Sequence, residues 1–209
     1  MVRDATEAAI RAVLNEKDFL NELDDKIGDG DHGLNMARGA QAAHEALAEL
    51  DEEAGLKEVL QAVGEAVTAN VGGSAGPLYG AAFSEAARVV DEDCALDAAT
   101  LEKIFTAMVA EIQKRGNADR GDKTMLDVLI PIRDSFAAEN CAGKSFEDIL
   151  TQARDAARDG LEFTKTIAAR KGRAASIGDK SIGCEDPGAA SSLIIFRALC
   201  AVWKDSLRE

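Results

Sequence analysis

Acidic residues and glycines crowd a short segment near the N-terminus, where residues 23–33 read LDDKIGDGDHG. Carboxylates this close repel one another unless a cation neutralises them. Glycine loses more backbone entropy on folding than any other residue, so three glycines here suggest that a ligand approaches the backbone closely. Asp24, Asp29 and Asp31 offer the hard oxygen ligands that Mg²⁺ prefers, and Mg²⁺ usually completes its coordination with substrate phosphates. The segment therefore predicts a magnesium site that also holds phosphate groups.

The sequence excludes one other interpretation of this acidic segment and leaves another open. The spacing is not that of an EF-hand, because the twelfth position from Asp29 is Ala40, where that loop needs a bidentate glutamate. An acidic turn in which Asp31 only caps the following helix stays open, although capping needs one carboxylate rather than three. The neighbouring His32 is either a phosphate contact or a local hydrogen-bonding residue.

Composition and charge narrow the class of protein. The chain has 209 residues, and no composition break divides it, so we expect one domain over residues 1–209. Its net charge of -14 repels nucleic acid and anionic membranes, so neither is an expected partner. No apolar run approaches the roughly 18 residues that a membrane span needs, and the N-terminus is charged where a secretory signal is apolar. The four cysteines are widely spaced, as is typical of reduced thiols, and we expect a cytoplasmic protein.

Apolar residues recur at helical spacing through most of the chain, and no stretch alternates as a strand would. Thr100 is the expected cap of the fifth helix, and the S-x-x-D pattern at Ser145 predicts a capping box for the seventh. The predicted fold class is all-α. The eight helices are expected at residues 3–22, 34–49 and 56–69, after Pro77, after Thr100, at 123–137, from Ser145 to about 169, and after Pro187.

The connections between these helices fall into two chemical classes. Those after the second, fourth and sixth helices are acidic or made of small residues, whereas those after the first, third, fifth and seventh are rich in glycine. Short connections favour antiparallel neighbours, so alternate connections lie at the same end of a bundle. The Gly-rich connections are therefore expected to meet at one end and to build one site from four distant parts of the sequence.

The other three Gly-rich connections add further chemistry. Residues 71–77 (VGGSAGP) open a helix, and backbone N–H groups at a Gly-rich helix N-terminus bind anions. Asp122 is expected to cap the sixth helix. Residues 170–173 form a tight basic cluster in an acidic chain, and Arg173 is the candidate that neutralises charge developing on a transferred phosphoryl group. Residues 186–188 open the last helix and are expected to lie against the base or ribose of a nucleotide.

Five motifs together resemble the nucleotide-binding L subunit of dihydroxyacetone kinase, the DhaL family. They are IGDGDHGLNMARG at 27–39, GPLYG at 76–80, GDKTMLDVLIP at 121–131, ARKGRAASIG at 169–178 and DPGA at 186–189. Their order and spacing agree with the family over nearly the whole chain. The resemblance implies an eight-helix antiparallel up-and-down barrel, with the ligand site at one end of a single DhaL-like domain.

The resemblance also implies the ligands and their contacts. The ligands are expected to be ADP or ATP with two Mg²⁺ ions, held by Asp24, Asp29 and Asp31, with Arg173 as the catalytic residue. The expected nucleotide contacts are His32, Gly33, Leu34, Asn35, Ser74, Ala75, Gly116, Met125, Arg173, Asp186, Pro187 and Gly188.

In such kinases a separate K subunit holds the ketose covalently through a histidine. The resemblance therefore implies that this chain supplies the phosphoryl group to a ketose on a K-subunit partner. Two modes stay open: ADP remains bound and is recharged by a phosphotransferase-system protein, or ATP exchanges at each turnover. The ketose, whether dihydroxyacetone or another such as erythrulose, stays open because its pocket lies on the other chain.

Two departures from the family pattern bear on the nucleotide contacts. The family usually reads GGASG where this chain has GGSAG at 72–76, which moves the hydroxyl of Ser74 by one position, and it usually has histidine in place of Cys184.

Two other functions stay open. One is a nucleotide-binding regulatory module without catalysis. The other is the lipid-linked fatty-acid kinase type, which tends to read GDTGTNM where this chain reads GDHGLNM.

Overall fold

The computed structural model describes residues 1–73, 75–92 and 94–207. These residues form ten α-helices and two short 3₁₀ helices and contain no β-strand, so the predicted all-α class is confirmed. The elements are α1 (Val2–Asn15), α2 (Lys17–Ile27), α3 (His32–Ala48), α4 (Leu56–Asn70), α5 (Ala75–Val89), α6 (Ala98–Gly116), α7 (Leu126–Phe136), α8 (Ala138–Cys141), α9 (Phe146–Thr164), η1 (Arg173–Ser176), η2 (Gly178–Ser181) and α10 (Pro187–Ser206).

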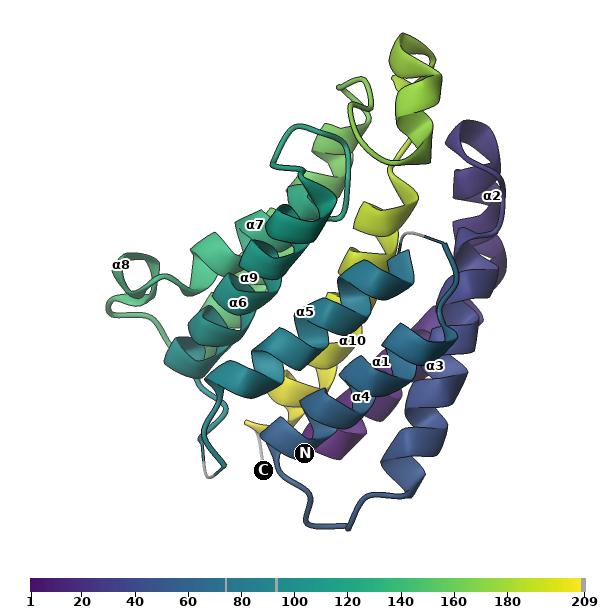
Figure 1. The fold of residues 1–209 in the computed structure, drawn as a ribbon. Coiled ribbons are helices and arrows are strands. Elements are labelled where there is room, and N and C mark those ends of the chain that lie inside the picture. Colours follow the sequence, from purple (N-terminus) through teal and green to yellow (C-terminus); the bar gives the residue numbers. More distant parts are fainter. Residues whose placement is uncertain (74, 93, 208–209) are drawn as a thin grey trace.

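Helices that follow one another in the sequence lie side by side and close into a ring. From α3 each long helix packs on the next, α9 packs on α10, and α10 returns to α1, which packs on α3. Because α8 is a single turn and α1 and α2 together occupy one place, the ring has the predicted eight members. The Gly-rich connections gather at the end occupied by α2, η1 and η2, whereas both termini and the bland connections lie toward the opposite end (Figure 1).

The first predicted helix is broken into two, which corrects the expectation of one helix over residues 3–22. The backbone leaves the α1 path at Glu16, and α2 then continues to Ile27. Asp24 therefore lies in the last turn of a helix rather than in a loop. The start of α2 packs tightly on the start of α3 at Gly33, where an added Cβ would overlap the carbonyl oxygen of Lys17.

One of two predicted helix caps is confirmed, and the other is wrong. The side chain of Ser145 accepts a hydrogen bond from the backbone N–H of Asp148 at 3.1 Å, which confirms the cap of α9. Thr100 is not the cap of α6. That helix begins earlier, and the carboxylate of Asp97 accepts from the N–H of Thr100 at 2.8 Å. Aspartate and threonine are both good caps, so the preference alone could not separate positions three residues apart.

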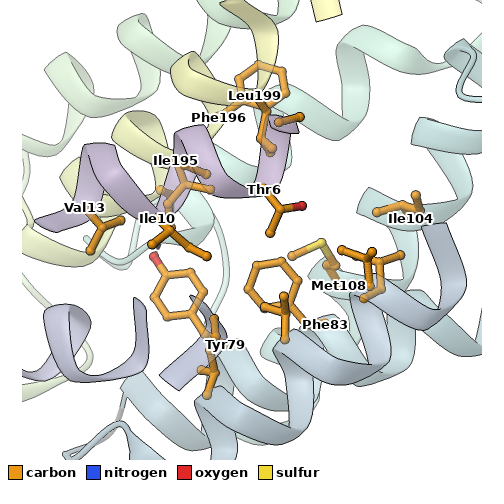
Figure 2. A pocket seen from close by; sticks show the side chains of 18 of the residues that line it. Thr6, Ile10, Val13, Tyr79, Phe83, Ile104, Met108, Ile195, Phe196 and Leu199 are labelled. Carbon is orange, nitrogen blue, oxygen red and sulfur yellow. Dashed lines mark hydrogen bonds between the residues drawn. The ribbon is translucent and has the colours of Figure 1, made fainter. Parts of the chain in front are cut away.

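The barrel interior is apolar and contains a cavity of about 150 Å³ (Figure 2). Ile10 of α1, Phe83 of α5, Met108 of α6 and Leu199 of α10 line it. Larger aliphatic and aromatic side chains supply most of the remaining wall, with four alanines of α1 and α3 among them. The hydroxyl of Tyr79, which also lines the cavity, donates to the carbonyl oxygen of Gly188 at 3.0 Å. The cavity therefore approaches the end of the barrel that carries the Gly-rich connections. Among the described residues, no helix is long and apolar enough to cross a membrane.

Candidate functional site

A cleft of about 210 Å³ lies where the Gly-rich connections meet. All four connections contribute to its wall, as the alternation of loop chemistry predicted. Gly33 and Leu34 do not line it: Gly33 is packed against α2, and Leu34 is exposed. Ser74 falls outside the described residues. The predicted residues that line the cleft are Asp24, Asp29, Asp31, His32, Asn35, Ala75, Gly116, Met125, Arg173, Asp186, Pro187 and Gly188.

Asp24 is the most firmly held of the three aspartates. The residue is only 8% exposed, and Oδ2 accepts hydrogen bonds from the backbone N–H groups of Asp31 at 3.0 Å and His32 at 3.1 Å. The carboxylate thus ties the end of α2 to the beginning of α3. Gly28 leaves room for it, because an added Cβ there would overlap Asp24 Oδ1. The acidic turn is therefore built around one fixed carboxylate.

Asp24, Asp29 and Asp31 can present one oxygen each within 4.8 Å of one another. Asp31 is the residue before α3, yet its side chain makes no capping hydrogen bond to the helix. It accepts instead from the Nδ2 group of Asn35 at 2.8 Å. The alternative in which Asp31 only caps the helix is therefore wrong. Three hard oxygen donors at this separation fit a Mg²⁺ ion.

Arg173 reaches this acidic cluster from η1. Its Nη1 pairs with Asp29 and lies 3.9 Å from Oδ1 of Asp31. Gly172, which precedes η1, has a φ of 68°, a backbone conformation that favours glycine. One guanidinium against three carboxylates leaves two negative charges, which is the charge that a divalent cation neutralises. The same guanidinium lies at the cleft, where it can contact an anionic ligand.

The beginning of α5 forms another part of the wall of the cleft, next to Arg173. The helix starts at Ala75, and Gly72, Gly73 and Ala75 all line the cleft. Gly73 has a φ of 68°, and a Cβ on Gly72 would lie 2.8 Å from Oδ1 of Asn35. The N-terminus of a 15-residue helix carries unpaired N–H groups and partial positive charge, which attract anions. This wall is suited to phosphate groups.

His32 joins the cleft to a buried network of hydroxyl groups. Its Nε2 lies 3.0 Å from the hydroxyl of Ser191, which in turn lies 3.1 Å from the hydroxyl of Tyr79. Tyr79 also contacts the hydroxyl of Ser192 at 2.6 Å. Burial lowers the pKa of His32 although Asp24 and Asp31 raise it, and burial raises the pKa of Tyr79 to about 12. The network orients the imidazole, so the local hydrogen-bonding interpretation of His32 describes this contact.

Asp186 and Pro187 open α10 at the cleft. The carboxylate of Asp186 caps the helix, accepting from the N–H of Ala189 at 2.8 Å, and its own N–H donates to Oγ1 of Thr164 at 3.1 Å. Burial, together with the nearby Asp127 carboxylate, raises the pKa of Asp186 to about 7. Residues 186–188 line the cleft, and their place against the base or ribose of a nucleotide stays a prediction.

The connection before α7 contains groups whose roles the sequence did not reveal. Asp122 does not cap that helix: its carboxylate accepts from the N–H of Asp119 at 2.9 Å, within the connection. The organising group is Asp127, which is fully buried and accepts from the N–H groups of Gly121 at 2.6 Å and Thr124 at 2.9 Å. Lys123, between them, is also buried. The available signal was that both charged residues fall within the predicted apolar helix at 123–137. Charged residues are rarely fully buried unless they are paired, so a buried one there needs partners.

Comparison with known proteins identifies the family. A family model for the DAK2 domain matches residues 26–201. A dihydroxyacetone kinase subunit of Listeria innocua, the PEP-dependent kinase 1 ADP-binding subunit DhaL, is 40% identical over 90% of this chain and 88% of its own. The chain belongs to the DhaL family. The predicted resemblance is therefore confirmed, and the chain is a member of the dihydroxyacetone kinase family.

A second relative and a solved structure are also similar to the DhaL chain. The ADP-binding subunit DhaL of the PEP-dependent dihydroxyacetone kinase of Escherichia coli K12 is 36% identical, over 91% of this chain and 90% of its own. The crystal structure of the dihydroxyacetone kinase from C. freundii in complex with AMP-PNP and Mg²⁺ superimposes with a TM-score of 0.76 at 28% identity. The match covers 96% of this chain and 33% of that longer kinase chain. The DhaL chain thus has the fold of one part of a dihydroxyacetone kinase.

Proposed function

We propose that this chain is the nucleotide-binding subunit of a small-ketose kinase, with dihydroxyacetone as the first candidate substrate. The observation that carries the proposal is the meeting of three carboxylates, Arg173 and the N-terminus of α5 around one cleft. Carboxylates alone would repel a nucleotide, and this set accepts one only together with divalent cations. The relatives named as ADP-binding subunits and the kinase structure with AMP-PNP and Mg²⁺ support the same assignment.

In this proposal the chain binds ADP or ATP with two Mg²⁺ ions. Asp24, Asp29 and Asp31 hold the metal, and bound Mg²⁺ supplies charge neutralisation at the phosphate oxygens. Gly72, Gly73 and the α5 N-terminus receive the phosphates. Arg173 pairs with Asp29 and is close enough to turn toward a phosphoryl group as negative charge develops on it.

The ketose is proposed to lie on a separate K subunit, so the chain transfers a phosphoryl group only when the open side of its cleft faces that partner. A retained ADP recharged by a phosphotransferase-system protein is the first mode of supply. It is supported by relatives that are named as subunits of PEP-dependent kinases. Exchange of ATP at each turnover is the other mode. A cytoplasmic location follows from this proposal, because both partners act there.

The assignment is tested first by binding. Calorimetry of ADP binding in the presence of Mg²⁺ is expected to lose its signal in Asp29→Ala, while the helical circular dichroism stays near that of the wild type, because Asp29 is exposed at the site and packs in no core. Unchanged ADP affinity in this variant would refute the metal assignment.

Native mass spectrometry then separates the modes of supply. Co-purified ADP with Mg²⁺ supports the retained cofactor, whereas an empty site with ATP turnover beside a K subunit supports exchange. Nucleotide binding with no phosphate transfer to a ketose on any K subunit would leave the chain a regulatory module and would refute the kinase proposal.

A further inference from the structure

Lys123 is a charged side chain buried at the centre of the site end, and nothing in the proposed function uses it. It lies in the connection between α6 and α7, is 1% exposed, and has a φ of 62°, which is rare for a residue other than glycine. We propose that Lys123 is a positioning residue, whose ammonium group acts as a tethered cation and fixes residues 165–186 so that Arg173 reaches the acidic cluster. The consequence for phosphoryl transfer rests on the proposed function, whereas the placement of the segment does not.

The ammonium group of Lys123 lies in a cage of backbone carbonyl oxygens. Its Nζ is 2.6 Å from the carbonyl oxygen of Thr164, 2.8 Å from that of Ser181 and 2.7 Å from that of Cys184. The carbonyl oxygen of Ile167 lies at 3.3 Å. An ammonium group has three donors, and three close acceptors occupy them. The carbonyl oxygens take the place of the water molecules that the ammonium group loses when it is buried.

These carbonyl groups belong to both ends of the segment that carries Arg173. Thr164 ends α9, whereas Ser181 and Cys184 lie just before α10. One side chain from another connection therefore joins both ends of the segment. The two ends also pair directly, because the N–H of Gly183 donates to the carbonyl oxygen of Lys165 at 2.8 Å and the N–H of Ala169 donates to Oγ of Ser181 at 2.8 Å. The backbone next to Lys123 contributes as well, since the carbonyl oxygen of Asp122 accepts from the N–H of Arg170 at 3.0 Å. Lys123 is thus the cross-link between the α6–α7 and α9–α10 connections.

Little apolar packing holds the same segment in place. Its buried contacts form a small cluster of Ile27, Ala169 and Ala174, separate from the barrel core. Ile27 ends α2, the helix that carries Asp24, so this cluster sets the segment beside the acidic residues. The segment itself adds only two buried alanines and the half-buried Ile177 and Cys184 to this cluster, a small apolar area when burial contributes roughly 25 cal/mol per Å². The carbonyl cage of Lys123 adds three close, charge-assisted contacts to this limited packing.

The occupied donors of Lys123 argue against a direct catalytic role. Its side chain reaches the cleft wall, but a phosphate oxygen would have to displace one of the carbonyl oxygens to contact Nζ. Burial lowers the pKa of Lys123, whereas the negative charges of Asp186 and Asp127 raise it. The two carboxylates thus offset part of the cost of burying the ammonium group.

The test uses Lys123→Ala, which empties the cage, in buffers that contain either ammonium chloride or sodium chloride at equal ionic strength. The matched control is Lys103→Ala, an exposed lysine of α6. The first measurement needs no substrate: it is the rate of trypsin cleavage at residues 170–173, identified by mass spectrometry. We expect cleavage in Lys123→Ala to be at least about tenfold faster in sodium than in ammonium. The control is expected to match the wild type in both buffers.

The second measurement is phosphoryl transfer beside a K subunit, compared with the affinity for ADP. A misplaced Arg173 is expected to slow transfer by of order 100-fold and to weaken ADP binding much less. Ammonium is expected to restore both cleavage resistance and transfer. Equal behaviour in the two salts, wild-type resistance to trypsin, or loss of helicity in sodium would each overturn the positioning role. Wild-type protein that binds no nucleotide would refute the proposed function alone, because the cleavage assay still decides the placement.

Discussion

Replacing Gly28 by alanine should disturb the metal site through the carboxylate of Asp24. An added Cβ would overlap Asp24 Oδ1 and lie 2.9 Å from its carboxyl carbon. Carbon atoms pack at about 3.5–4.0 Å, so the carboxyl carbon has to move by roughly 0.6–1 Å, and the oxygen by more. The carboxylate can move only by giving up its bonds to the N–H groups of Asp31 and His32, which contribute about 1.5–3 kcal/mol each as charge-assisted hydrogen bonds.

The loss should appear mainly in the affinity for Mg²⁺ and for nucleotide bound with it. Mg²⁺ demands near-ideal octahedral geometry at about 2.0–2.1 Å, so it does not follow a ligand displaced this far. Disturbing the partners that orient a ligand typically lowers metal affinity by about 10- to 100-fold, which is about 1.4–2.7 kcal/mol. Calorimetry of ADP binding, with and without Mg²⁺, measures the effect, and thermal unfolding followed by circular dichroism reports whether the barrel remains folded.

A matched control lies at the other end of the barrel. Gly55 precedes α4, and the nearest atom to an added Cβ is the carbonyl oxygen of Glu92 at 3.4 Å, an ordinary contact. Gly55→Ala should therefore bind Mg²⁺ and ADP as the wild type does. Wild-type affinity in Gly28→Ala would refute the reasoning. An equal loss of ADP affinity in metal-free buffer would also refute it, because the effect would then not pass through the metal.

Three further changes test separate parts of the site. Arg173→Ala should slow phosphoryl transfer by about 10³-fold or more and weaken ADP binding far less; equal losses in steady-state kinetics and calorimetry would show that Arg173 acts only in ground-state binding. Tyr79→Phe removes a buried hydroxyl whose partners keep other hydrogen bonds, and it should lower the free energy of unfolding in urea by about 0.5–1.5 kcal/mol, a result that an unchanged midpoint would contradict. The pKa of Asp186 is raised from 3.8 to about 7, so the folded state resists its ionisation, and its contribution to the free energy of unfolding should fall as pH rises from about 4 to about 7. Asp186→Asn keeps a capping residue and should flatten that part of the pH profile; an identical slope in both proteins would refute the assignment.

The sequence predicted the end of the barrel that carries the site because the reasoning depended only on connectivity. Helical spacing defines the helices, short connections alternate between the two ends, and chemistry that recurs in every second connection must then gather at one end. Asp24, Asp29, Asp31 and Arg173 were found separately, because their charges are conspicuous in the sequence. These residues lie together at the cleft.

Positions that depend on local geometry could not be predicted in the same way. The break at Glu16 has no glycine or proline to signal it, and the capping preferences of Asp97 and Thr100 are too similar to separate. Gly33 belongs to a motif of the site, yet it serves the contact between α2 and α3. A glycine in a binding motif signals close approach without saying whether a ligand or a helix approaches.

Lys123 shows a different limit of the sequence. Its partners are carbonyl groups of residues 41 to 61 positions away, and every residue has a carbonyl group, so no pattern of side chains could identify them. The lysine stands beside Asp122 and near Asp127, which makes a surface ion pair the simplest expectation for it. Only the folded chain shows that its charge is turned inward, to the base of the segment that carries Arg173. Two cations thus serve the acidic cluster. Arg173 faces the carboxylates directly, and Lys123 holds the segment from which Arg173 projects.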